Sequence, residues 1–96
     1  MSVWVTLEMH VKEGQYDTLE VFLSEKLPAV RGFEGALGVT LYFDQDTNTL
    51  LIVEEWKSQD HHAAYIAAIT ANDVLNQLAA FMKAPPAIKY YSRLAL

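Results

Sequence analysis

The sequence contains no cysteine, no cluster of basic residues and no long hydrophobic run. Without cysteine, the chain has no disulfide framework, thiol nucleophile or thiolate metal site. The 7 lysines and arginines stand singly among 12 acidic residues, and the net charge is −5, so we expect no binding to nucleic acid or to anionic membranes. No apolar stretch approaches the roughly 18 residues that a membrane span needs. The first residues, MSVWVTLEM, lack a basic segment before an apolar one, so we expect no signal peptide and a cytoplasmic protein.

The composition points to a small domain that shares a surface with a partner. A chain of 96 residues predicts a single domain over 1–96, with a modest core. Hydrophobic residues nevertheless make up 52% of the sequence. We therefore expect further apolar surface to be buried at an interface.

The hydrophobic periodicity alternates between that of strands and that of helices. Residues 3–11 alternate strictly, which predicts a half-buried strand with its odd-numbered side chains facing the core. Spacings of three and four residues in two later stretches predict amphipathic helices. The expected elements are strands over 3–11, 36–44, 50–56 and 87–94, and helices over 15–27 (ended by Pro28), 59–69 (capped by Ser58) and about 73–82 (begun by a cap at Thr70).

This order, β-α-β-β-α-α-β, predicts an α+β protein of the ferredoxin-like, split βαβ type. Its antiparallel sheet is covered by helices on one face only. Because the other face also carries apolar side chains, we expect a second copy of the chain to cover it and form a symmetric homodimer.

Residues 50–65, LLIVEEWKSQDHHAAY, are the stretch where we expect the functional site. Strand parity places Glu54 and Trp56 on one face, and His61 and His62 follow on the first turns of the next helix. Two consecutive histidines point about 100° apart, so at most one faces inward, and they are poorly placed to chelate one metal ion. Glu54 is expected to be half-solvated at the sheet edge; a buried Glu54 would need a partner, such as Arg31 or Tyr90.

Four segments together resemble the antibiotic biosynthesis monooxygenase family. They are VKEG (11–14), LPAVRGFEG (27–35), EEWKS (54–58) and PPAIKYY (85–91), and the likeness spans essentially the whole chain. The resemblance implies a dimeric α/β barrel with a pocket between sheet and helices in each subunit. It also implies small oxygenases that act on quinols or polyketides without metal or flavin, so no cofactor is expected.

Carried over residue by residue, the resemblance matches this chain in part. Trp56 matches the tryptophan of the quinone-forming branch, whereas the asparagine and tyrosine of that branch are replaced by Ile52 and His62. The asparagine of the haem-degrading branch falls on Leu7, which disfavours haem degradation. The histidine of the quinol monooxygenases falls on Tyr65.

We therefore expect His62 to act as the acid/base group and Trp56 to be the aromatic plate of a site that takes a small phenolic, quinol or polyketide-like molecule. The residues expected to line this site are Tyr65, Ile52, Leu7, Arg31, Phe81 and Tyr90. Two alternatives remain open: a non-catalytic protein that binds a small hydrophobic ligand, and an isomerase on the same scaffold.

Overall fold

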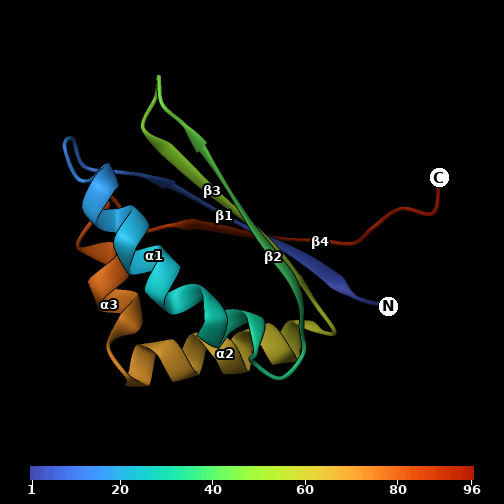
Figure 1. The fold of residues 1–96 in the computed structure, drawn as a ribbon. Coiled ribbons are helices and arrows are strands. Elements are labelled where there is room, and N and C mark those ends of the chain that lie inside the picture. The colour runs from blue at the N-terminus through green and yellow to red at the C-terminus, as the bar shows by residue number, and fades with distance from the viewer.

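The protein forms one four-stranded sheet with three helices, and the computed structural model describes all of residues 1–96 (Figure 1). The elements, in chain order, are β1 (Val3–His10), α1 (Tyr16–Arg31), β2 (Ala36–Asp44), β3 (Thr49–Trp56), α2 (Gln59–Ala71), α3 (Val74–Ala79) and β4 (Ala87–Tyr91).

The sheet is antiparallel throughout, with the strand order β2-β3-β1-β4. All three helices lie on one of its faces (Figure 1). This arrangement confirms the predicted α+β, ferredoxin-like, split βαβ fold with the order β-α-β-β-α-α-β. None of the helices has the length and hydrophobicity that crossing a lipid bilayer requires.

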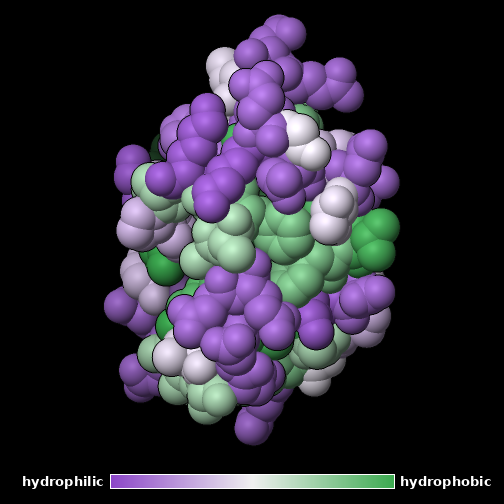
Figure 2. All heavy atoms as spheres, turned by 90° about the vertical axis from the view of Figure 1, so that its left-hand side faces the viewer, coloured by the Kyte–Doolittle hydropathy of each residue, from purple (hydrophilic) through white to green (hydrophobic).

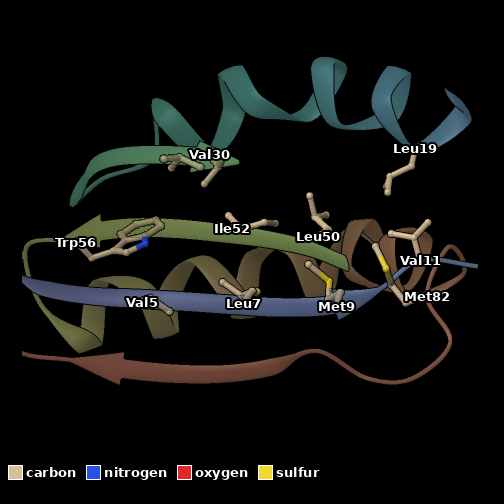
Figure 3. Packing of buried hydrophobic residues seen from close by; sticks show 11 residues of the cluster. Val5, Leu7, Met9, Val11, Leu19, Val30, Leu50, Ile52, Trp56 and Met82 are labelled. Atoms are coloured by element: carbon tan, nitrogen blue, oxygen red, sulfur yellow. The ribbon is translucent and has the colours of Figure 1, made fainter. Parts of the chain in front are cut away.

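The core lies between the sheet and the helices, and strand parity determines its membership (Figure 3). In β1, Val5, Leu7 and Met9 are buried, and alternate residues of β3 are buried in the same way, from Leu50 to Trp56. From the helix side, Leu19 and Val30 of α1 point toward the sheet (Figure 3). The alternation read from the sequence is therefore confirmed, because side chains of a strand point alternately to its two faces.

Helix α1 is longer than predicted, because Pro28 does not end it. The helix continues to Arg31, with Pro28 inside it, and the amide of Gly32 bonds back to the carbonyl of Pro28. Proline inside a helix loses one amide bond. The extra turn buries Val30 against the core, which offsets that loss.

A β-bulge in β2 interrupts the regular alternation expected of a strand over 36–44, which would place Leu37 on the same face as Val39. Ala36 pairs with Trp56 and Gly38 with Glu55, so Leu37 is the additional residue on the β2 side. Leu37 is consequently 51% exposed, whereas Val39 is buried. A single inserted residue reverses the parity of the strand segment before it.

The boundary between α2 and α3 also differs from the prediction. Thr70 caps no helix; its hydroxyl bonds to the carbonyl of Ile66 and α2 continues to Ala71. The side chain of Asn72 accepts a bond from the amide of Val74, where α3 begins. Helix α3 ends at Ala79, before the predicted limit, and β4 ends at Tyr91 rather than at residue 94.

Candidate functional site

The junction of β3 and α2 holds its side chains in place through a helix cap and a close contact. The hydroxyl of Ser58 accepts a bond from the amide of His61, as predicted for an N-cap, and also lies 2.6 Å from Nδ1 of His61. The ring of His61 lies directly against Gly35, where a Cβ atom would overlap it. These contacts fix the rotation of α2, so that His61 lies toward Gly35 and His62 faces the core.

Glu54 and Trp56 form a buried pair on the core face of β3. Nε1 of Trp56 donates a hydrogen bond of 2.8 Å to Oε1 of Glu54, and their exposed fractions are 0% and 4%. The expectation of a half-solvated Glu54 is therefore wrong, and neither Arg31 nor Tyr90 is its partner. The indole lies two residues further along the same strand, on the same face, and supplies the donor that a buried carboxylate needs.

His62 lies behind this pair and bridges it to β4. It is 0% exposed, and its Nδ1 lies 2.7 Å from the hydroxyl of Tyr90. Its Nε2 has no hydrogen-bond partner and lies 3.6 Å from Oε1 of Glu54. Glu54, His62 and Tyr90 thus form a continuous chain of polar atoms from β3 through α2 to the edge strand β4.

Burial shifts the pKa values of the site in the directions that disfavour charge. Desolvation raises the pKa of Glu54, and the hydrogen bond from Trp56 opposes that rise. Desolvation also lowers the pKa of His62. Burial, followed by the charge of Glu54, raises the pKa of Tyr65 to about 12. The pKa values of the Glu54 carboxyl and the His62 imidazole have therefore moved toward each other.

Aromatic rings surround the polar atoms. The ring of Trp56 lies 5.3 Å from that of Tyr65, 5.5 Å from that of His62 and 6.1 Å from that of Phe33, between centroids. Phe33 also packs edge-on to Tyr65 at 5.3 Å. Such edge-on and tilted arrangements are favourable for aromatic pairs. The rings exclude water from Trp56 and fix the orientation of its N–H.

A small cavity of about 50 Å³ opens between the sheet and the helices beside Glu54. It holds roughly one or two water molecules. Its lining residues come from α1, the sheet, α2 and α3: Phe22, Leu23, Lys26, Leu27, Val30, Val39, Leu41, Ile52, Glu54, Tyr65, Ile69, Val74 and Leu78. Only Lys26 and Glu54 bring a formal charge to this lining.

One oxygen of Glu54 remains available to this cavity. Oε1 accepts the bond from Trp56, whereas Oε2 makes no hydrogen bond. The buried polar side-chain atoms without a partner are Nε1 of Trp4 and Nε2 of His62, and Oε2 is not among them. Glu54 is one of the residues that line the cavity, and Oε2 is its carboxylate oxygen without a hydrogen bond. A hydroxyl group in the cavity would find an acceptor there.

The residues expected to line the site separate into two groups. Tyr65 and Ile52 line the cavity. Leu7 is buried in the core of β1, and Phe81 packs against Phe22 at 5.4 Å. Arg31 donates from Nη2 to the carbonyl of Val39 at 2.9 Å, and so ties the end of α1 to β2. Tyr90 lies on the far side of His62 from the cavity.

Three residues that were not predicted for the site line the cavity from α1: Leu23, Lys26 and Leu27. Their helical spacing predicted an apolar face without distinguishing a wall of a cavity from a part of the core. No group of three or more His, Asp or Glu side chains is arranged to hold a metal ion. The site therefore consists of a carboxyl, an imidazole and aromatic rings.

A second, larger hollow shares only Leu78 with the lining of this cavity. Figure 2 shows hydrophobic atoms gathered between polar ones on the side of the molecule that carries α3. A groove of about 440 Å³ runs there, and it contains none of Glu54, Trp56 and His62. Its lining residues are Met9, Leu75, Asn76, Leu78, Ala79, Met82, Lys83, Ala84, Pro85, Pro86 and Ile88.

Solved structures share this fold across nearly their whole length. A conserved protein from Methanosarcina mazei Go1 superposes with a TM-score of 0.86 at 16% identity, covering 98% of this chain and 94% of that one. Rv0793 from Mycobacterium tuberculosis gives 0.84 at 17% identity, with coverage of 100% and 98%. A crystal structure of an antibiotic biosynthesis monooxygenase gives 0.84 at 15% identity, with coverage of 96% and 98%. At these identities the likeness concerns the fold alone.

The sequence itself identifies the family. No curated protein matches the chain. The family model for antibiotic biosynthesis monooxygenase, however, matches residues 2–68, from β1 to most of α2, a range that includes Glu54, Trp56 and His62. The chain therefore belongs to the antibiotic biosynthesis monooxygenase family.

Proposed function

We propose that this protein is a cofactor-independent monooxygenase that acts on a small phenolic, quinol or polyketide-like molecule in the cavity between sheet and helices. One observation carries the proposal: a buried carboxylate, Glu54, with one oxygen free of hydrogen bonds, lines an apolar cavity walled by Tyr65. Oxidation of an electron-rich ring by O2 needs a base for its hydroxyl proton and a site with little water. The arrangement supplies both.

The reaction balances without a further oxidant or reductant. The base takes the hydroxyl proton, and the electron-rich anion transfers one electron to O2. The resulting substrate radical and superoxide combine into a peroxide. Loss of water leaves a carbonyl, so one oxygen atom enters the product and the other becomes water. The substrate supplies both electrons, and the two protons that it loses balance the two in that water, whether or not the base exchanges its proton with solvent in between.

Glu54 and His62 share the acid/base role in this proposal. Glu54 lines the cavity, whereas His62 does not, and Nε2 of His62 lies 3.6 Å from Oε1 of Glu54. His62, expected from the sequence to be the base, therefore acts through Glu54. Trp56 does not line the cavity; it orients the carboxylate through its N–H and packs behind Tyr65, which provides the aromatic wall.

A ring enters the cavity if side chains of α1 move aside. The cavity of about 50 Å³ has room for O2, but it is too small for a six-membered ring. Leu23 and Leu27 line this cavity and also line a groove of about 250 Å³ between α1 and the β2–β3 hairpin. Rotation of these leucines toward the groove enlarges the cavity without moving the backbone.

Oxygen uptake with a reactive hydroquinone tests the proposal. We expect uptake that requires both protein and substrate, and loss of turnover in the absence of O2. The His62→Ala variant should lose most of its rate, and His10→Ala is the matched control because His10 is exposed on β1. Turnover at the wild-type rate in His62→Ala would show that the acid/base assignment is wrong.

We also propose that the open face of the sheet pairs with a second copy. Trp4 lies on this face with an indole N–H that has no partner, and Tyr42 of β2 is exposed on the same face. A symmetric interface buries such a face against itself. Analytical ultracentrifugation should give twice the mass of the chain, and a Trp4→Glu variant should sediment as a monomer. A monomeric wild-type protein would contradict this interface.

The small size of the cavity favours a second candidate function, a non-catalytic protein that binds a small hydrophobic ligand. Trp56 is 0% exposed, so no open space lies beside the indole. Under this alternative, calorimetry with a phenol would show binding while oxygen uptake stays at the background rate.

A further inference from the structure

We propose that Glu54 exchanges its proton with water at the edge of β4, through His62 and Tyr90, rather than through the mouth of the cavity. This inference rests on the proposed function, because it concerns how the base at the cavity is reset. It assigns to Tyr90 the role of a positioning and proton-carrying residue rather than that of a substrate contact.

The three residues span the layer between sheet and helices. Glu54 lies on the core face of β3 and is one of the residues that line the cavity. His62 lies on α2, with Nε2 3.6 Å from Oε1 of Glu54 and Nδ1 2.7 Å from the hydroxyl of Tyr90. Each ring nitrogen of His62 thus faces one of its two polar neighbours, Glu54 or Tyr90, which is the geometry of a proton shuttle.

Tyr90 connects this chain to the surface. It lies on β4, at one edge of the sheet, and pairs in register with Val5 of β1. Because Val5 faces the core, Tyr90 lies on the helix-covered face, where its hydroxyl reaches His62. Tyr90 is nevertheless 39% exposed, so the edge of β4 brings this ring close to water.

The proton balance is simple. When Glu54 is neutral, its proton moves to Nε2 of His62, the proton on Nδ1 moves to the oxygen of Tyr90, and Tyr90 releases its own proton to water. The result is a carboxylate at Glu54, a neutral imidazole protonated on Nε2 and an unchanged tyrosine. The reverse sequence returns a proton to Glu54. The 3.6 Å gap requires the carboxyl group to rotate toward His62 during the transfer.

The surroundings make this route useful. Lys26 is the charged side chain that α1 brings to the cavity lining, and Arg31 is held on the carbonyl of Val39, which pairs with Glu54 across β2 and β3. Tyr65 faces Glu54 from α2, with its pKa raised to about 12, so it does not accept the proton as an anion. A substrate that fills the cavity blocks the direct path, and His62 and Tyr90 leave a second one.

The first experiment follows the tautomer of His62 by ring-nitrogen NMR as the pH crosses the titration of Glu54. In the wild-type protein, we expect the proton to lie on Nδ1 while Glu54 is neutral and on Nε2 once Glu54 is ionised. Glu54→Gln should abolish this switch, and so should Tyr90→Phe, which removes the partner of Nδ1. Tyr91→Phe is the matched control, since Tyr91 is exposed on the opposite face of the same strand. A tautomer that stays constant with pH in the wild-type protein overturns the proposal.

The second experiment measures turnover of a hydroquinone. We expect Tyr90→Phe to lower kcat about 10-fold or more, with KM unchanged, because proton exchange and not binding is impaired. A higher concentration of a small buffer such as imidazole should restore part of that rate, which a purely structural defect would not allow. Equal kcat values for Tyr90→Phe and Tyr91→Phe overturn the relay.

The two experiments separate the possible failures. If the wild-type protein consumes no O2 with any phenol while the tautomer switch is present, the relay stands and the proposed oxygenase function is wrong. If turnover is normal and the switch is absent, the relay is wrong and the function stands.

Discussion

Replacement of Trp56 by Phe tests how the buried carboxylate is held. The variant keeps an aromatic ring but removes the N–H group that donates the one hydrogen bond of the Glu54 side chain. Loss of a hydrogen bond to a buried charged acceptor costs about 1.5–3 kcal/mol. The smaller ring leaves a void that costs a further ~1–2 kcal/mol. We therefore expect the free energy of unfolding to fall by about 2.5–5 kcal/mol at neutral pH, a large share of the ~5–15 kcal/mol typical of a domain.

The pH dependence identifies the source of this loss. Below its pKa, Glu54 is neutral, and a neutral hydrogen bond contributes only about 0.5–1.5 kcal/mol. The cost of Trp56→Phe should therefore shrink as the pH falls through the pKa of Glu54. Because the indole bond holds that pKa down, its removal should also raise the pKa of Glu54 further.

Urea unfolding at several pH values measures these effects, with Trp4→Phe as the matched control. The indole N–H of Trp4 has no hydrogen-bond partner, so its removal costs no such bond. A double-mutant cycle with Glu54→Leu should give a coupling energy of roughly 1–3 kcal/mol between Glu54 and Trp56. Equal costs for the two tryptophan variants at every pH, or additive effects in the cycle, would refute the reasoning.

Three further predictions concern stability. Gly35→Ala should lower it by about 2–4 kcal/mol in thermal or urea unfolding, since φ is +90° and a Cβ atom would displace His61; an unchanged midpoint would contradict the close contact. Pro28→Ala should raise it by ~1–2 kcal/mol, because the restored amide can bond to Ser24 inside α1, and a destabilised variant would show that proline suits this turn. Glu54→Gln should gain stability relative to the wild type as the pH rises above 4.5 toward neutral. The pKa of Glu54 is raised in the folded protein, so the stability that neutral Glu54 contributes is fully present below its pKa in the unfolded chain and is lost as the pH rises through its pKa in the folded protein. Parallel pH profiles of the two proteins would contradict this prediction.

Local patterns were sufficient to predict the sheet and the cap of α2. Strand parity placed Glu54 and Trp56 on one face, and Ser58 was recognised as the cap of α2. Pro28 misled the prediction because the helix rule considers the lost amide bond and not the burial that Val30 gains two residues later. The bulge at Leu37 had no local signal, since it depends on the register between two strands.

The polar site was only partly predictable for a related reason. Arg31 and Tyr90 were the expected partners of a buried Glu54, but the indole N–H of Trp56, on the same strand face, takes that place. The sequence left open whether His61 or His62 faces inward, because a helical wheel gives the angle between them but not the rotation of the helix. That rotation depends on Gly35, which is distant in sequence and leaves room for the ring of His61.

The central claim is that a substrate hydroxyl meets the free oxygen of Glu54 and that the substrate anion then reacts with O2. Mass spectrometry of a hydroquinone reaction under isotopically labelled O2 tests it most directly. The account predicts one labelled oxygen atom in the product, with the rate strongly reduced in Glu54→Gln and retained in Tyr91→Phe. An unlabelled product, or labelling that proceeds at the same rate in Glu54→Gln, would contradict it.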